Sequence, residues 1–177
     1  MKALIFLLPL FVVNACKTQT GTVISSENTK TEQVENKVGC PEEGACTVAV
    51  HQNKNLVIKE DGTGALYPEM VTGENMVVVY TYSKEGPEGT VDGNYSETVH
   101  FEIPATAENL SIENASLSEV KLLYGKQCFC RGEAGFYLIS NGKLLVEKTA
   151  TALVFDLKFK VEKTSQVVSD ISETVKL

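Results

Sequence analysis

The sequence lacks several features that would indicate a particular chemistry. It contains no tryptophan and only two histidines among its 177 residues. It also lacks the phosphate-binding motifs G-x-G-x-x-G and G-x-x-x-x-G-K-[ST] and the zinc motif H-E-x-x-H, so no motif supports dinucleotide binding, P-loop chemistry or a zinc protease. Without tryptophan, a platform for stacking sugars would have to use tyrosines, two of which already fit the core pattern. These tyrosines are Tyr67, Tyr80, Tyr82, Tyr95 and Tyr137.

Basic residues are also scarce. The chain has 16 Lys and Arg against 23 Asp and Glu, a formal net charge of −7. Neutralising phosphates requires Lys and Arg, so we expect no nucleic-acid partner. The same acidity disfavours docking of the protein surface onto anionic lipid and favours solubility. No pattern calls for a cofactor.

The chain has one long apolar run, at its start. Lys2 precedes residues 3–13, which are almost unbroken apolar side chains, and Asn14, Ala15 and Cys16 follow. A membrane-spanning helix needs about 20 apolar residues, so this run is too short to be one. A positive residue, a short apolar run and a small residue before a cut site are the layout of a secretory signal.

The cysteine after that layout makes the leader similar to those of bacterial lipoproteins. The resemblance covers only this leader and Cys16, under a tenth of the chain. It implies cleavage before Cys16 and acylation of that residue, palmitate included. Such lipids would hold the chain to a membrane, and Lys17 rather than Asp after the cysteine implies the outer membrane. The alternative is an ordinary secretory signal followed by a chance cysteine.

Beyond the leader, the sequence predicts a tether and one domain. Residues 1–15 would be the signal peptide and residues 16–38 a flexible tether, because polar side chains dominate there and too few apolar ones occur to offset the entropy of ordering. Residues 39–177 would form a single all-β domain, long enough to bury a core.

Short alternating segments with turn signals every 8–12 residues predict the fold class of that domain. They indicate an antiparallel β-sandwich of about 8–10 short strands. Residues 76–82 are apolar on both faces and should be a central strand, while residues 153–161 alternate as a half-buried strand. Residues 83–94 should form the longest loop.

Several local predictions are finer. Residues 52–55 should be a hairpin loop, and residues 108–124 should hold two short strands. Asn141-Gly142 between two apolar runs predicts a type I′ hairpin. The tail, residues 164–177, fits either a helix or a sparse strand.

With Cys16 assigned to lipid, four cysteines remain. An even number in an oxidising compartment predicts disulfides. Were Cys128 and Cys130 in one strand, their Cα atoms would lie roughly 6.5–7 Å apart, at the limit for a disulfide, and a bond between them would force a bend. We therefore expect Cys40 and Cys46 to pair with Cys128 and Cys130, although three connectivities are possible.

The alternative use of the same four cysteines is a metal site. Four thiolates in the spacing C-x5-C and C-x-C could hold Zn²⁺ or Cu⁺ in a tetrahedral arrangement. The spacing is not that of a zinc ribbon, and C-x-x-C beside a βαβ unit, the pattern of thiol–disulfide enzymes, is absent.

Other candidate ligands and catalysts are isolated. Strand alternation places His51 and His100 opposite their apolar neighbours, so both should face solvent or an outer surface, and nothing orients either one for catalysis. A soft copper site with Met70 and Met76 is weakened because Met76 fits the core pattern. A Ca²⁺ loop at residues 92–94, near Glu85, Glu88 and Glu97, lacks the EF-hand spacing.

The function predicted from these observations is a membrane-anchored lipoprotein of the cell envelope. Its membrane contact would be the lipid on Cys16. We expect it to bind or scaffold envelope proteins without catalysis, through the loop after Tyr82 and the cysteine region, because rigid sandwiches carry function on loops. The alternative is a metal-binding protein that uses the four remaining cysteines.

Overall fold

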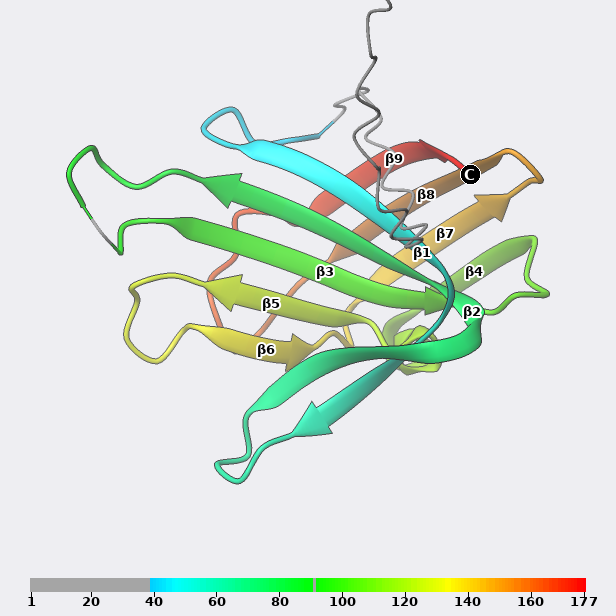
Figure 1. Ribbon diagram of the computed structural model, residues 1–177, viewed down its shortest axis with the longest axis horizontal. Coiled ribbons are helices and arrows are strands. Elements are labelled where there is room, and N and C mark those ends of the chain that lie inside the picture. The colour runs from blue at the N-terminus through cyan, green and yellow to red at the C-terminus, as the bar shows by residue number, and fades with distance from the viewer. Residues whose placement is uncertain (1–38, 91) are drawn as a thin grey trace, which may run out of the picture.

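The computed structural model describes residues 39–90 and 92–177, and Figure 1 shows two β-sheets packed face to face. The predicted all-β sandwich is confirmed, because nine strands of the described residues form two antiparallel sheets. The predicted signal peptide, Cys16 and the tether lie outside the described residues. Within the described part, no helix is long and apolar enough to cross a membrane.

The larger sheet has five strands in the order β1-β2-β3-β5-β6. Each neighbouring pair is antiparallel. As predicted, residues 76–82 are central, since they lie in β2 between β1 and β3. The strands are β1 (Ala45–Glu60), β2 (Leu66–Lys84), β3 (Tyr95–Ile103), β5 (Leu123–Gln127) and β6 (Gly135–Leu138).

The smaller sheet has four strands in the order β4-β7-β8-β9. The tail, for which the sequence allowed a helix or a strand, forms a strand, because residues 170–176 pair with β8 along their length. The strands are β4 (Asn109–Glu113), β7 (Gly142–Lys148), β8 (Ala152–Phe159) and β9 (Asp170–Lys176).

The core lies between the two sheets, where alternate residues of each strand point inward. On β3 the inward residues Val99, Phe101 and Ile103 are fully buried. Phe101 meets Phe155 of β8 edge to face, with ring centroids 5.2 Å apart. Edge-to-face aromatic pairs add about 0.5–1.5 kcal/mol beyond the area they bury, so this pair helps fix the relative position of the sheets.

The β1–β2 hairpin extends beyond the other strands of the larger sheet, because β2 pairs with β3 only from Met76 to Lys84. We call its far part, residues 54–72, the arm; it bends away and passes below β6 in Figure 1. The N–H of Leu56 donates to a Glu102 carboxylate oxygen at 2.5 Å, and Lys121 Nζ donates to the Leu56 carbonyl at 2.8 Å. Lys121 also pairs with Glu102 at 2.9 Å. The two hydrogen bonds of Leu56 to this ion pair hold the arm against the outer face of the larger sheet.

The arm explains a second group of buried apolar side chains. Leu56, Val77 and Leu123 are fully buried, yet they lie outside the core cluster between the sheets. Strand alternation directs Val77 and Leu123 to the outer face, which a simple sandwich would leave to solvent. An apolar outer face is therefore stable here because the chain covers part of it with its own hairpin.

Two local predictions were wrong, and a third was right only in part. Residues 52–55 are not a hairpin loop but an irregularity inside β1, where the register shifts and Asn53 has φ of 57°. Asn141-Gly142 does not join a hairpin, because β6 pairs with β5 and β7 pairs with β4 and β8. Of the two short strands expected within residues 108–124, the first is present as β4, but a 3-10 helix (Asn114–Val120) that leads into β5 takes the place of the second.

The role of Gly142 gives the physical reason for the second error. A Cβ on this residue would lie 2.3 Å from the backbone oxygen of Lys158. Glycine is therefore required for close approach of β7 to β8, not for a tight hairpin turn. The Asn-Gly pair lies where the chain passes from one sheet to the other.

Candidate functional site

All four described cysteines lie near one end of the sandwich, which we call the cysteine end. It comprises the start of β1, the end of β2, the start of β3, the end of β5 and the loops 85–94 and 161–169. The structure pairs Cys40 with Cys46 and Cys128 with Cys130. The expected cross-pairing between the two halves was therefore wrong, whereas disulfide-distance pairing itself is observed.

The second bond forms because β5 ends early. Strand pairing stops at Gln127, and the chain bends at Cys128 and Phe129. The Cα atoms of Cys128 and Cys130 come within 5.2 Å of each other, closer than in an extended strand. The bend also turns Phe129 outward, where it is 91 % exposed. A short disulfide loop thus presents an aromatic side chain to solvent.

The first bond closes the turn that begins the domain. Cys40 and Cys46 have Cα atoms 5.8 Å apart, and the Tyr80 hydroxyl donates to Cys46 Sγ at 2.9 Å. Within the turn, a Cβ on Gly44 would lie 2.3 Å from the Tyr82 ring and 2.5 Å from the Ser83 carbonyl oxygen. Glycine is required at this position because the turn packs directly onto the end of β2.

A buried carboxylate ties loop 161–169 to the larger sheet. Glu97 of β3 is only 1 % exposed. Its two oxygens accept the backbone N–H groups of Val167 at 2.6 Å and Val168 at 2.8 Å, and the Tyr95 hydroxyl also donates to it. Burial, followed by the bond to Glu97, raises the pKa of Tyr95 well above its usual range. Tyr95 therefore stays protonated at ordinary pH.

A buried lysine makes a second tie to the same loop. Lys126 of β5 pairs with Glu133 at 2.6 Å and donates to the Ser165 hydroxyl at 2.8 Å and the Ser165 carbonyl at 3.0 Å. Its ammonium also lies 5.6 Å from the centroid of the Tyr95 ring. The hydrogen bond from Lys126 is the main cause that lowers the pKa of Glu133 to about 2. These contacts give the cysteine end a fixed shape.

Two hollows open at the cysteine end. The first, which we call the apolar groove, lies between the Cys40–Cys46 turn and loop 85–94 and has a volume of about 540 Å³. Its wall includes Pro41, Tyr82, Pro87, Tyr95 and Val167. Volumes of about 300–1,000 Å³ with apolar and aromatic linings are typical of binding sites.

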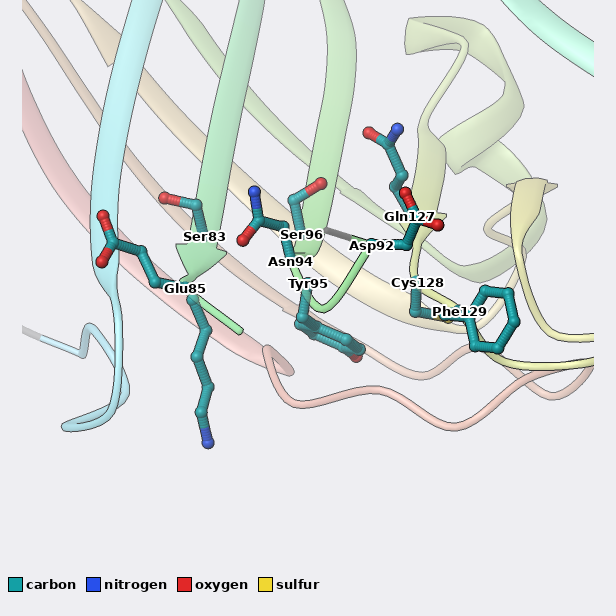
Figure 2. A pocket seen from close by; sticks show the side chains of 10 residues that line it. Ser83, Glu85, Asp92, Asn94, Tyr95, Ser96, Gln127, Cys128 and Phe129 are labelled. Carbon is teal, nitrogen blue, oxygen red and sulfur yellow. The ribbon is translucent and has the colours of Figure 1, made fainter. Parts of the chain in front are cut away.

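The second hollow, which we call the polar hollow, has a volume of about 720 Å³. Figure 2 shows its lining side chains, most of which end in a hydroxyl, amide or carboxylate. Tyr95 points the opposite way in this view. The polar-hollow residues that the argument uses below are Ser83, Glu85, Asp92, Asn94, Ser96, Gln127 and Phe129.

The histidine prediction was half wrong. His51 is half-buried, but His100 is only 9 % exposed, and its Nδ1 atom has no hydrogen-bond partner within the described residues. His100 points to the outer face, as alternation predicted, but that face is covered, and its ring lies 6.1 Å from that of Phe136. Burial, with a smaller contribution from the charge of His51, lowers the pKa of His100 to about 4.

This burial predicts a pH dependence of stability. The unfolded chain takes up a proton on His100 near pH 6.5, whereas the folded chain does so only near pH 4. The contribution of His100 is therefore complete above pH 6.5 and is lost as the pH falls from 6.5 to 4. We expect the free energy of unfolding of the His100→Leu variant to fall by about 2 kcal/mol less than that of the wild type between pH 7 and pH 4.5.

Urea unfolding at each pH measures this difference. The matched control is His51→Gln, because His51 is less buried and should contribute a smaller share of the pH dependence. If the free energies of unfolding of the wild type and of His100→Leu changed equally with pH, the prediction would be wrong, because unfolding would then not add a proton to His100 between pH 7 and pH 4.5.

The structure does not bring the other predicted ligands together. Met76 lies in the core between the sheets, as predicted, and Met70 lies on the arm. Among residues 39–90 and 92–177, no group of three or more His, Cys, Asp or Glu side chains is arranged to hold a metal ion. The four sulfurs that a thiolate site would need are in disulfides, and a disulfide sulfur is not a thiolate ligand.

Comparison with known proteins finds no matching family model, no matching curated protein and no matching solved structure. The site must therefore be interpreted from its own residues. Sequence reasoning missed Phe129 and Val167, which are exposed apolar residues at the cysteine end. The signal for Phe129 was the short spacing Cys-Phe-Cys, because a bond between those cysteines bends the chain and turns the middle side chain outward.

Proposed function

We propose that the protein is a lipoprotein of the bacterial cell envelope, anchored by lipid on Cys16, with a non-enzymatic binding or scaffolding role. The anchor part of this proposal depends on the leader and Cys16. We assign the binding role to the apolar groove at the cysteine end. The partner would be a segment of another envelope protein.

The observation that supports the binding role most strongly is the rigid construction of the groove. Its floor is set by Tyr82 and Tyr95, and one wall is the turn that the Cys40–Cys46 disulfide closes. Glu43 and Lys84, which both line the groove, form an ion pair. Glu97 holds Val167 at the opposite side through the backbone. Preformed apolar sites bind well because less conformational entropy is lost on association.

The charges at the groove indicate the chemistry of the partner. Glu42 and Glu85 line it and are exposed, and neither takes part in an ion pair within the described residues. Carboxylates beside an apolar floor favour a segment that carries apolar side chains and at least one Lys or Arg. A non-enzymatic role agrees with the use of Glu97 and Lys126 as structural ties.

Site-specific photo-crosslinking in cells tests this role. A photoreactive phenylalanine analogue placed at Val167, which is 50 % exposed, should give one dominant crosslinked protein. The same analogue at Leu145, an exposed apolar position on β7 of the other sheet, is the matched control. Glu85→Lys should reduce the Val167 crosslink several-fold. Equal crosslinking from both positions, or none from Val167, would contradict the role of the groove.

A further inference from the structure

The polar hollow shares Lys84, Glu85 and Tyr95 with the apolar groove, but the rest of its lining is mostly polar. Ser83, Ser96 and Gln127 lie directly beside one another on β2, β3 and β5, because Ser83 pairs with Ser96 and Ser96 pairs with Gln127. Neighbouring strands are ~4.8 Å apart, so these side chains form a row of polar groups at regular spacing. The row ends where β5 stops and the Cys128–Cys130 loop begins.

Loop 85–94 adds acceptors and an amide above this row. Figure 2 shows the polar ends of Glu85, Asp92 and Asn94 on the same side of the sheet as those of Ser96 and Gln127. Asn94 accepts a hydrogen bond from the Gly86 N–H, which sets its orientation. The side chains of Glu85, Asp92, Ser96 and Gln127 make no hydrogen bond within the described residues. Their donors and acceptors are open to a ligand.

The one large apolar side chain of the hollow is Phe129. It is 91 % exposed, and the Cys128–Cys130 disulfide limits the motion of the backbone that carries it. Covering an exposed aromatic ring with a flat apolar surface lowers the free energy, because apolar area is removed from water. The hollow thus combines one aromatic platform with a row of mixed hydrogen-bonding groups.

From this combination we infer that the polar hollow is a binding site for a neutral oligosaccharide. The C–H face of a pyranose ring would stack on Phe129. Sugar hydroxyls both donate and accept hydrogen bonds, so they match a lining in which carboxylates accept, amides do both and serine hydroxyls do both. The regular spacing of Ser83, Ser96 and Gln127 suits the repeating hydroxyls of an extended glycan. This site does not depend on a membrane anchor, and Ser96, Gln127 and Phe129 line the polar hollow but not the apolar groove.

The charge and size of the hollow narrow the ligand class. The lining carries two negative charges, on Glu85 and Asp92, and its one positive charge, on Lys84, is paired with Glu43. Uronic-acid and sulfated sugars should therefore bind more weakly than neutral ones. A volume of about 720 Å³ admits more than one sugar ring and lies within the usual range for ligand sites. A compact cation fits poorly, because no set of three acidic, His or Cys side chains converges among the described residues.

Isothermal titration calorimetry of the full chain in detergent tests this inference. The probes are chitotetraose, cellotetraose and maltotetraose as neutral sugars, and tetragalacturonate as the acidic one. At least one neutral probe should bind with a Kd of about 0.1–10 mM, and tetragalacturonate at least about tenfold more weakly than that probe.

Two variants then locate the site. Phe129→Ala should weaken binding about tenfold or more, and Gln127→Ala, which leaves the disulfide loop intact, about threefold or more. Leu145→Ala, which removes an exposed apolar side chain from the other sheet, should bind as the wild type does. The inference is overturned if no neutral probe binds up to about 10 mM, if both variants bind normally, or if tetralysine binds in place of the sugars.

Discussion

Replacing Cys16 with serine is expected to abolish acylation and to remove the protein from the outer-membrane fraction. Serine lacks the thiol that would carry the lipid. A single acyl chain gives only marginal membrane binding, with a constant of about 10⁴ M⁻¹, whereas two or more make the anchor effectively permanent. The change should therefore be close to all-or-none. Incorporation of labelled palmitate, together with fractionation of the envelope, measures it.

The control for this experiment is a substitution in the neighbouring predicted tether. Thr18→Ser leaves Cys16 unchanged and should incorporate as much palmitate as the wild type. Label in the Cys16→Ser variant, or its absence from the wild type, would contradict the assignment of Cys16 to lipid.

The second large effect is expected at the cysteine end. Glu97→Ala removes the acceptor for the N–H groups of Val167 and Val168 and for the Tyr95 hydroxyl. A buried donor left without a partner costs about 1–3 kcal/mol. The Val168 N–H is buried, and the Val167 N–H and the Tyr95 hydroxyl are partly buried. We therefore expect the free energy of unfolding to fall by about 3–5 kcal/mol, a large part of the stability of a typical domain. Chemical denaturation measures the loss.

Two further variants show whether the loss comes from these hydrogen bonds. Glu97→Gln keeps one acceptor oxygen and the shape of the side chain, so it should lose less stability than Glu97→Ala. Glu108→Ala, at an exposed position, should change stability by at most about 0.5 kcal/mol. In Glu97→Ala, amide hydrogen exchange at Val167 and Val168 should also accelerate. A loss below about 1 kcal/mol would mean that Glu97 does not hold loop 161–169.

The fold class could be predicted because long strands carry a clear period. Residues 153–161 alternate between apolar and polar side chains, and Leu153, Phe155 and Leu157 are buried as that pattern requires. Prediction failed where a sequence signal had two physical meanings. The polar run around Asn53 resembles a turn, but a strand can absorb it as an irregularity. Gly142 resembles half of a hairpin turn, but close approach to Lys158 requires it.

The site was only partly predictable, because its parts are distant in sequence. The sequence indicated that loop 83–94 and the cysteines were candidate contact surfaces, and the structure brings both to one end. It did not indicate that Glu97 would bind backbone groups 70 residues away. It also predicted His100 to be exposed, since alternation identifies the outer face but not whether that face is covered. The cysteine pairing was missed because a bend shortens the distance between Cys128 and Cys130.

The most direct test of the proposed identity is the intact mass of the protein extracted from membranes without a reducing agent. The account predicts a chain that begins at Cys16 and carries the added mass of several acyl chains. Because of its two disulfides, this chain should be four hydrogen atoms lighter than after reduction. A chain that retains residues 1–15, one without acyl mass, or one whose mass does not change on reduction would contradict the account.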